Sequence, residues 1–182
     1  MTTKNIFNNL PTLETDRLIL RKVTLADAAD IFAYASDEEV AKYVTWNVHK
    51  TIQDTERFIY FIFSRYESNS PAPWAIENKE NGKVIGTIDY VMWQEDHKVA
   101  EVGYALSKDY WGKGIMSEAL EAVKTFGFEH MDLVRIQAHC MAENIGSARV
   151  MEKAGLTYEG TKKKALLIKN RHRDLKGYAI TK

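Results

Sequence analysis

The order of the apolar segments constrains the fold more than any other feature of the sequence. Three apolar runs follow one another with only short polar turns between them: 73–78, 83–93 and 98–107. The first turn holds Asn81-Gly82, and an Asn-Gly pair between two apolar runs is a strong signal for a β-hairpin. The stretch therefore predicts an antiparallel meander of three strands.

On both sides of the meander, helical and strand patterns alternate. An alternating strand and two helices come before it: 17–22, 25–36 and 52–66. A helix, a strand, a helix and a last pair of strands follow it: 114–130, 133–141, 144–155 and the region around 169–174. We therefore predict an α/β (α+β) fold in a single domain over 1–182. Its core is a mixed, mostly antiparallel sheet of about seven strands with helices on both faces.

The two helices that precede the meander have clear start signals. Thr24 with Asp27 and Thr51 with Asp54 both match the spacing of a capping box, in which each residue satisfies a free backbone N–H of the other. These pairs predict where both helices begin.

Composition and charge exclude several classes of partner. The 182 residues carry a formal net charge of zero and are 45% hydrophobic, which predicts a soluble chain long enough to bury a core. No overall basic field favours nucleic acid or a membrane surface. Six basic residues gather near the C-terminal end and are interpreted as a solvated strand and turn, with an anion patch as the alternative: Lys162, Lys163, Lys164, Lys169, Arg171 and Arg173.

The single cysteine and the absence of long apolar stretches favour a location in the cell interior. Cys140 has no partner for a disulfide and is expected to be a buried structural thiol. No segment approaches the ~20 apolar residues that span a membrane, and the first residues lack the apolar core of a signal peptide. We therefore expect a cytoplasmic protein. Its oligomeric state is not set by the sequence, and a homodimer is compatible with it.

Two glycines surround a lysine in the segment "DYWGKGIMSEAL", residues 109–120, at the start of a predicted helix. A helix N-terminus reached through glycines presents free N–H groups and a positive dipole end, which together favour an anion such as phosphate. The alternative is that Gly112 and Gly114 only turn the chain. A Walker loop is absent, and Ser117 stands where a Rossmann loop needs its third glycine.

Three segments together resemble the GNAT superfamily of acetyl-CoA-dependent N-acetyltransferases, and within it the Rim-type branch that acetylates ribosomal-protein N-termini. They are "LETDRLILRKVTLADA" at 13–28, "AEVGYALSKDYWGKGIMSEAL" at 100–120 and "NIGSARVMEKAGL" at 144–156. The resemblance implies a GNAT-like sheet, acetyl-CoA as cosubstrate and a primary amine as acceptor.

The resemblance also implies a set of cofactor-binding residues. The backbone N–H groups of the loop would hold the pyrophosphate of CoA: Gly112, Lys113, Gly114, Ile115, Met116 and Ser117. Ala105 and Leu106 would pair with the pantetheine arm, and Asn144 would contact the same arm or cap its helix. Met116 replaces the usual small residue, which is tolerated where its side chain points away from the phosphate.

The same resemblance indicates the residues for catalysis. Glu101 lies where many members carry a carboxylate that takes the amine proton directly or through a water, although an exposed structural charge is the alternative. Ser147 lies where Rim-type relatives place a hydroxyl near the sulfur; the alternative is a small residue in the first helical turn. The tyrosine that some members use is replaced by Met151, and the carboxylate that certain Rim-type enzymes carry after Glu159-Gly160 is missing.

The missing carboxylate favours an acceptor with a low pKa. An α-amino group with a pKa near ~7.8 is roughly a quarter neutral at about pH 7.4, whereas a lysine near ~10.4 is only ~0.1% neutral. We therefore expect the N-terminal α-amine of a protein or peptide. A small-molecule amine and a non-catalytic CoA-binding module are the alternatives. His97, His139 and His172 have neither i, i+4 spacing nor a carboxylate partner in sequence, so no metal site is predicted.

Overall fold

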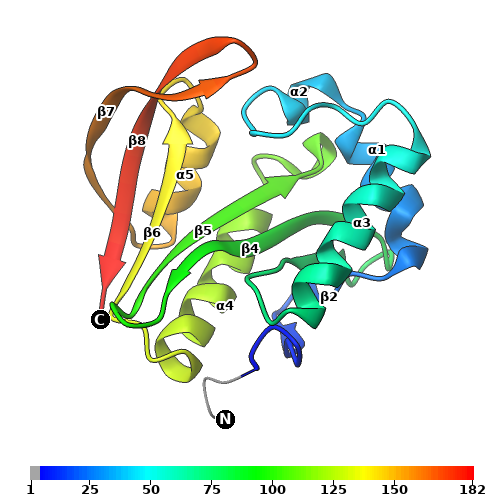
Figure 1. Ribbon diagram of the computed structural model, residues 1–182, viewed down its shortest axis with the longest axis horizontal. Coiled ribbons are helices and arrows are strands. Elements are labelled where there is room, and N and C mark those ends of the chain that lie inside the picture. The colour runs from blue at the N-terminus through cyan, green and yellow to red at the C-terminus, as the bar shows by residue number, and fades with distance from the viewer. Residues whose placement is uncertain (1–4) are drawn as a thin grey trace.

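The computed structural model describes residues 5–182, which form one mixed sheet with helices packed on it (Figure 1). Its eight strands are β1 (Leu13–Glu14), β2 (Leu18–Lys22), β3 (Trp74–Asn78), β4 (Val84–Gln94), β5 (Val99–Leu106), β6 (Arg135–Met141), β7 (Thr157–Ile168) and β8 (Arg171–Thr181). Their order across the sheet is β1-β2-β3-β4-β5-β6-β8-β7. Neighbouring strands are antiparallel except β5 and β6, which are parallel.

The helices occupy the connections between these strands. They are α1 (Ala28–Ala35), α2 (Glu38–Ala41), α3 (Ile52–Glu67), α4 (Ile115–His130) and α5 (Ile145–Lys153), with 3-10 turns at Leu25–Asp27 and Lys108–Tyr110. The mixed, mostly antiparallel sheet is confirmed. Its eighth strand, β1, and the short helix α2 were not predicted, because two and four residues are too few to show a periodic pattern.

Both predicted capping boxes are present. The Asp27 side chain accepts from the Thr24 N–H at 2.8 Å, and the Asp54 side chain accepts from the Thr51 N–H at 3.0 Å. The first box starts a 3-10 turn that leads into α1, and the second starts α3 directly. These local signals therefore set the helix starts.

The helices cover the two faces of the sheet. On one face the hydroxyl of Tyr90 donates to the carbonyl oxygen of Val123 in α4 at 2.6 Å, beside the fully buried Trp74. On the other face Thr87 lines a small hollow with Tyr34 of α1 and Phe58 of α3. Figure 1 shows α1 and α3 on one side of the sheet and α4 on the other. We name these the α4 face and the α1/α3 face.

The sheet opens between its two parallel strands. β5 and β6 pair only from Val99 with Arg135 to Val102 with Ala138. Beyond that point β5 continues to Leu106 on β4, while β6 continues to Met141 on β8. Figure 1 shows the two strands diverging from their common end. We call this opening the split.

The helices are also short by the standard of a membrane segment. Among residues 5–182, none combines the length and the apolar character needed to cross a bilayer.

Candidate active site

The loop before α4 exposes a row of backbone N–H groups. Gly112 and Gly114 have φ values of 72° and 74°, the left-handed region that favours glycine. The first bond of the helix runs from the Glu118 N–H to the Gly114 oxygen at 3.1 Å. Within residues 5–182, the N–H groups from Gly112 to Ser117 have no acceptor. A helix start of this kind suits a phosphate.

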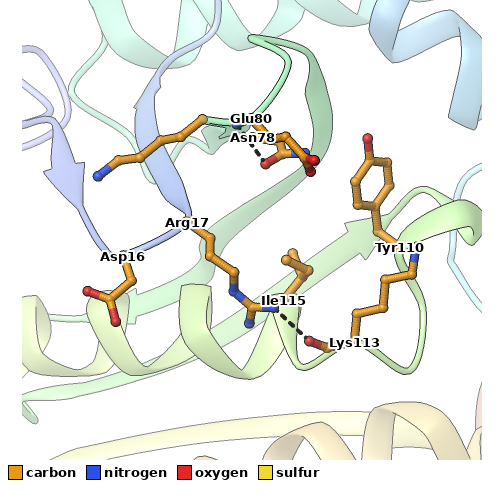
Figure 2. A pocket seen from close by; sticks show the side chains of 8 residues that line it. Asp16, Arg17, Asn78, Glu80, Tyr110, Lys113 and Ile115 are labelled. Carbon is orange, nitrogen blue, oxygen red and sulfur yellow. Dashed lines mark hydrogen bonds between the residues drawn. The ribbon is translucent and has the colours of Figure 1, made fainter.

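Two cations from other elements lie beside this loop. A Cβ built on Gly114 would lie 3.6 Å from Nη2 of Arg17 and 3.7 Å from Nζ of Lys153. Arg17 Nη1 donates to the Lys113 oxygen at 2.9 Å, as Figure 2 shows, and Arg17 Nε pairs with Glu118 at 2.6 Å. The guanidinium thus holds the loop and adds positive charge. Sequence reasoning missed both residues, and the 96 positions between Arg17 and Lys113 explain why no local pattern indicates Arg17.

A hollow of about 400 Å³ adjoins the loop on the side of the β3–β4 turn (Figure 2). Its lining consists of Asp16, Arg17, Asn78, Lys79, Glu80, Tyr110, Lys113 and Ile115. The Tyr110 hydroxyl accepts from Asn81 Nδ2 at 2.9 Å, and Lys113 Nζ lies 5.4 Å from the Tyr110 ring centre. These contacts join the β3–β4 turn to the loop. The hollow carries charges of both signs, so its lining does not select an anion.

Ile115 and Met116 anchor the first turn of α4 in the core. They are 5% and 3% exposed and belong to the main hydrophobic cluster. The side chain of Met116 is therefore buried rather than on the surface of the loop, where it would crowd an anion. The departure from the small residue of the family pattern therefore adds side-chain volume to the core.

Tyr104 and Ser147 meet across the split on the α4 face. Tyr104 lies on the part of β5 beyond the β5–β6 ladder, and its hydroxyl is 2.9 Å from the Ser147 hydroxyl in the first turn of α5. Asn144 caps that helix, since its Oδ1 accepts from the Ser147 N–H at 3.1 Å. The buried Cys140 lies on β6, and burial raises the pKa of its thiol. Sequence reasoning indicated Ser147 but missed Tyr104.

The end of β5 is held by contacts on both of its last residues. The Leu106 oxygen accepts from the indole Nε1 of Trp111 at 2.9 Å. The Ala105 oxygen faces Gly86 of β4 so closely that any Cβ there would collide with it. These contacts fix Ala105 and Leu106 between the loop and the split.

Glu101 lies on the opposite face from Ser147. Side chains alternate along a strand, so Glu101 points to the α1/α3 face while Tyr104 points to the α4 face. The Glu101 Oε2 accepts from Gln137 Nε2 at 3.0 Å, and Oε1 lies 3.0 Å from His139 Nδ1. Burial raises the pKa of the Glu101 carboxyl, but these two partners outweigh it and the net pKa is lowered. The structure therefore does not join Glu101 and Ser147 in one cluster.

His139 corrects one expectation from the sequence. It does have a carboxylate partner, Glu101, which lies 38 positions earlier but on the adjacent strand. Only the register of the parallel pair brings the two together. Within the part of the chain that the structure describes, no three His, Cys, Asp or Glu side chains form a metal-binding group.

Most of this chain matches a known protein family. A family model described as "Acetyltransferase (GNAT) domain" matches residues 17–157, from Arg17, just before β2, to the start of β7. The chain belongs to the GNAT acetyltransferase family. In this GNAT acetyltransferase, the loop before α4 and the split between β5 and β6 both lie within the matched region.

Individual relatives agree with this assignment. This GNAT acetyltransferase is 33% identical over 172 residues to the uncharacterized N-acetyltransferase YoaA of Bacillus subtilis (strain 168), covering 94% of this chain and 97% of that protein. The crystal structure of a GNAT-family acetyltransferase from Bacillus anthracis superposes with a TM-score of 0.84 at 32% identity, covering 94% and 98%. The ribosomal-protein-serine acetyltransferase of Escherichia coli (strain K12) is 31% identical over 97 residues, covering 53% and 54%.

Proposed function

We propose that this enzyme transfers the acetyl group of acetyl-CoA to a primary amine, and that the acceptor is the N-terminal α-amine of a protein or peptide. The observation that carries the proposal is the row of free N–H groups from Gly112 to Ser117, flanked by Arg17 and Lys153, next to the split. A phosphate-bearing cosubstrate suits the loop, and an extended arm suits the exposed edges of β5 and β6.

The proposed roles follow from these positions. The loop from Gly112 to Ser117, including Lys113, Ile115 and Met116, binds the pyrophosphate. Ala105 and Leu106 line the arm from β5, and Asn144 contacts it from the start of α5. When bound, acetyl-CoA supplies an acetyl group activated as a thioester.

The two proton transfers are assigned to residues on opposite faces of the sheet at the split. Ser147, with Tyr104 at 2.9 Å, lies on the α4 face and donates a proton to the leaving sulfur. Glu101, on the α1/α3 face, assists loss of the proton from the amine. The acceptor therefore approaches from the α1/α3 face.

The choice of an α-amine rests on two supports. A low-pKa amine needs little help to lose its proton, and the segment after Glu159-Gly160 lacks the carboxylate that certain Rim-type enzymes carry there. The partial similarity to a ribosomal-protein-serine acetyltransferase agrees with such an acceptor.

A small cationic amine is the second candidate, favoured by Asp89. This carboxylate lies on β4 opposite Gly103, on the α1/α3 face, and its Oδ1 lies 3.6 Å from the place of a Cβ on Gly103. Burial raises its pKa to about 7, although Arg65 acts in the opposite direction. An acidic group near the split would attract an ammonium group.

The deciding experiment measures thiol release from acetyl-CoA with a panel of N-terminal peptides, polyamines and amino-acid analogues. We expect turnover with peptide α-amines and an acetylated N-terminus in the mass spectrum of the product. Turnover with polyamines alone would favour the second candidate. Acetyl-CoA binding without turnover of any acceptor would contradict the proposed reaction.

A further inference from the structure

The carboxylate of Glu101 is already engaged in the free protein. One oxygen accepts from Gln137 Nε2 at 3.0 Å and the other lies 3.0 Å from His139 Nδ1. Together these partners lower the pKa of the carboxyl despite its burial. A carboxylate whose charged form is stabilised in this way takes a proton from an amine less readily.

His139 lies at the start of the split. It is the first residue of β6 beyond Ala138, the last residue to pair with β5. Its side chain shares the α1/α3 face with Glu101, because Glu101 pairs with Gln137 and side chains repeat every two residues. The imidazole is therefore next to the opening through which the amine would meet the thioester.

The contact with Glu101 sets the orientation of the ring. A neutral imidazole that donates its Nδ1–H to a carboxylate keeps a free electron pair on Nε2. The same carboxylate stabilises the imidazolium that forms when Nε2 takes a proton. Imidazole is also the side chain that exchanges protons in the neutral range.

Gly177 leaves the Nε2 edge of the ring uncovered. This residue of β8 pairs with His139, and a Cβ there would lie 3.4 Å from Nε2. Among residues 5–182 no hydrogen-bond partner of Nε2 is present, and the His139 side chain is 18% exposed. The charged groups that act on it are Glu101 from β5 and Glu159 from β7, and Glu159 is itself paired with Arg135. Lys162 of β7 acts in turn on Glu101.

We propose that His139 is the general base for the acceptor amine and that Glu101 is its positioning residue. This inference rests on the proposed function and names the group that removes the proton. The amine nitrogen forms its bond to the acetyl carbon as the carbon–sulfur bond breaks. The nitrogen loses one proton to Nε2 of His139, and the sulfur gains one from the Ser147 hydroxyl. Both side chains return to their starting state by exchange with solvent.

The test compares His139→Asn with wild type on a peptide that wild type acetylates. The asparagine amide replaces Nδ1–H as donor to Glu101 but offers no base. We expect kcat to fall about 10²-fold, and the low-pH limb of the kcat profile to disappear. Acetyl-CoA affinity and the melting temperature stay unchanged. The matched control is His97→Asn in the exposed β4–β5 turn, which retains wild-type kcat.

Unchanged kcat in His139→Asn, or a slower enzyme with the wild-type pH profile, would overturn the inference while leaving the acetyl transfer itself established.

A second measurement needs no acceptor and no variant. The ¹⁵N NMR spectrum of the free protein should show the neutral His139 ring protonated on Nδ1. A ring protonated on Nε2 would overturn the inference by itself, whichever amine the enzyme acetylates.

Discussion

The backbone and the side chain of Ser147 have different partners, and both hold the residue at the split. Its N–H donates to Asn144 at 3.1 Å, while its hydroxyl meets Tyr104 at 2.9 Å. The motif around Asn144 predicts the first contact because both residues lie in one turn. The second joins positions 43 apart and exists only because β5 diverges from β6 beneath α5, so the sequence could not indicate Tyr104.

Removal of the Ser147 hydroxyl should slow the reaction only modestly. A thiol with a pKa near ~8.5 leaves with little help, so Ser147→Ala should lower kcat by less than about tenfold. Tyr104→Phe should give a similar or smaller loss, because the Ser147 hydroxyl remains. Steady-state kinetics on one peptide acceptor would check both values. A loss of about 10³-fold in either variant would show that protonation of the sulfur limits the rate.

At the scale of elements, the prediction succeeded where a segment is long and periodic. The meander, α3, α4 and α5 lie within a few residues of their expected bounds. The two glycines of the loop precede α4 as expected, and their positive φ values of 72° and 74° are a finding of the structure. The cations around the loop could not be predicted, since Arg17 comes from the turn between β1 and β2 and Lys153 from the end of α5.

A negative charge in the loop should weaken the binding of acetyl-CoA. Gly114→Asp places a carboxylate beside the N–H groups, between Arg17 and Lys153, and adds a Cβ at a φ of 74°. We expect affinity to fall at least tenfold, or about 1.4 kcal/mol, by calorimetry. Gly114→Ala carries the same backbone strain without charge and should lose less. Equal acetyl-CoA affinity in wild type and folded Gly114→Asp would show that the loop is not part of the acetyl-CoA site.

The contact between α4 and the sheet depends on a glycine. A Cβ at Gly127 would collide with the Tyr90 hydroxyl and lie 2.9 Å from Leu133 Cδ1. Gly127→Ala should therefore destabilise the fold by about 1–3 kcal/mol, although alanine favours helix by about 1 kcal/mol. Gly146→Ala is the matched control, because the nearest atom there is Asn144 Oδ1 at 3.7 Å. Denaturant unfolding should show a loss only for Gly127→Ala; equal stability would mean that Tyr90 moves aside freely.

At the scale of the whole molecule, the split divides the sheet into β1–β5 and β6–β8–β7. Four residue pairs of the β5–β6 ladder join the two parts. Further contacts cross between them: Tyr104 with Ser147, Lys124 with the Ala154 oxygen at 2.9 Å, and Lys169 with the Ala41 oxygen. A cosubstrate bound in the split would touch both parts.

Acetyl-CoA should therefore raise the melting temperature. A ligand that binds only the folded state at 100 times its Kd adds about 2.7 kcal/mol. For a domain of this size we expect a rise of about 5–10 °C. The shift is measured by calorimetry, and Gly114→Asp at the same acetyl-CoA concentration should show a smaller one. An identical melting temperature with and without acetyl-CoA would contradict binding in the split.

The position of β8 has a consequence for how the chain is made. β8 follows β7 in the sequence but lies between β6 and β7 in the sheet, pairing with both. During synthesis from the N-terminus, β7 is therefore complete before the strand that attaches it to the rest of the sheet exists. Until β8 emerges, the edge of β6 is open and the 12 residues of β7 have no place in the sheet. A ribosome that stalls within residues 171–181 would hold a nascent chain with an unpaired β6 edge, the kind of surface that recruits chaperones or aggregates.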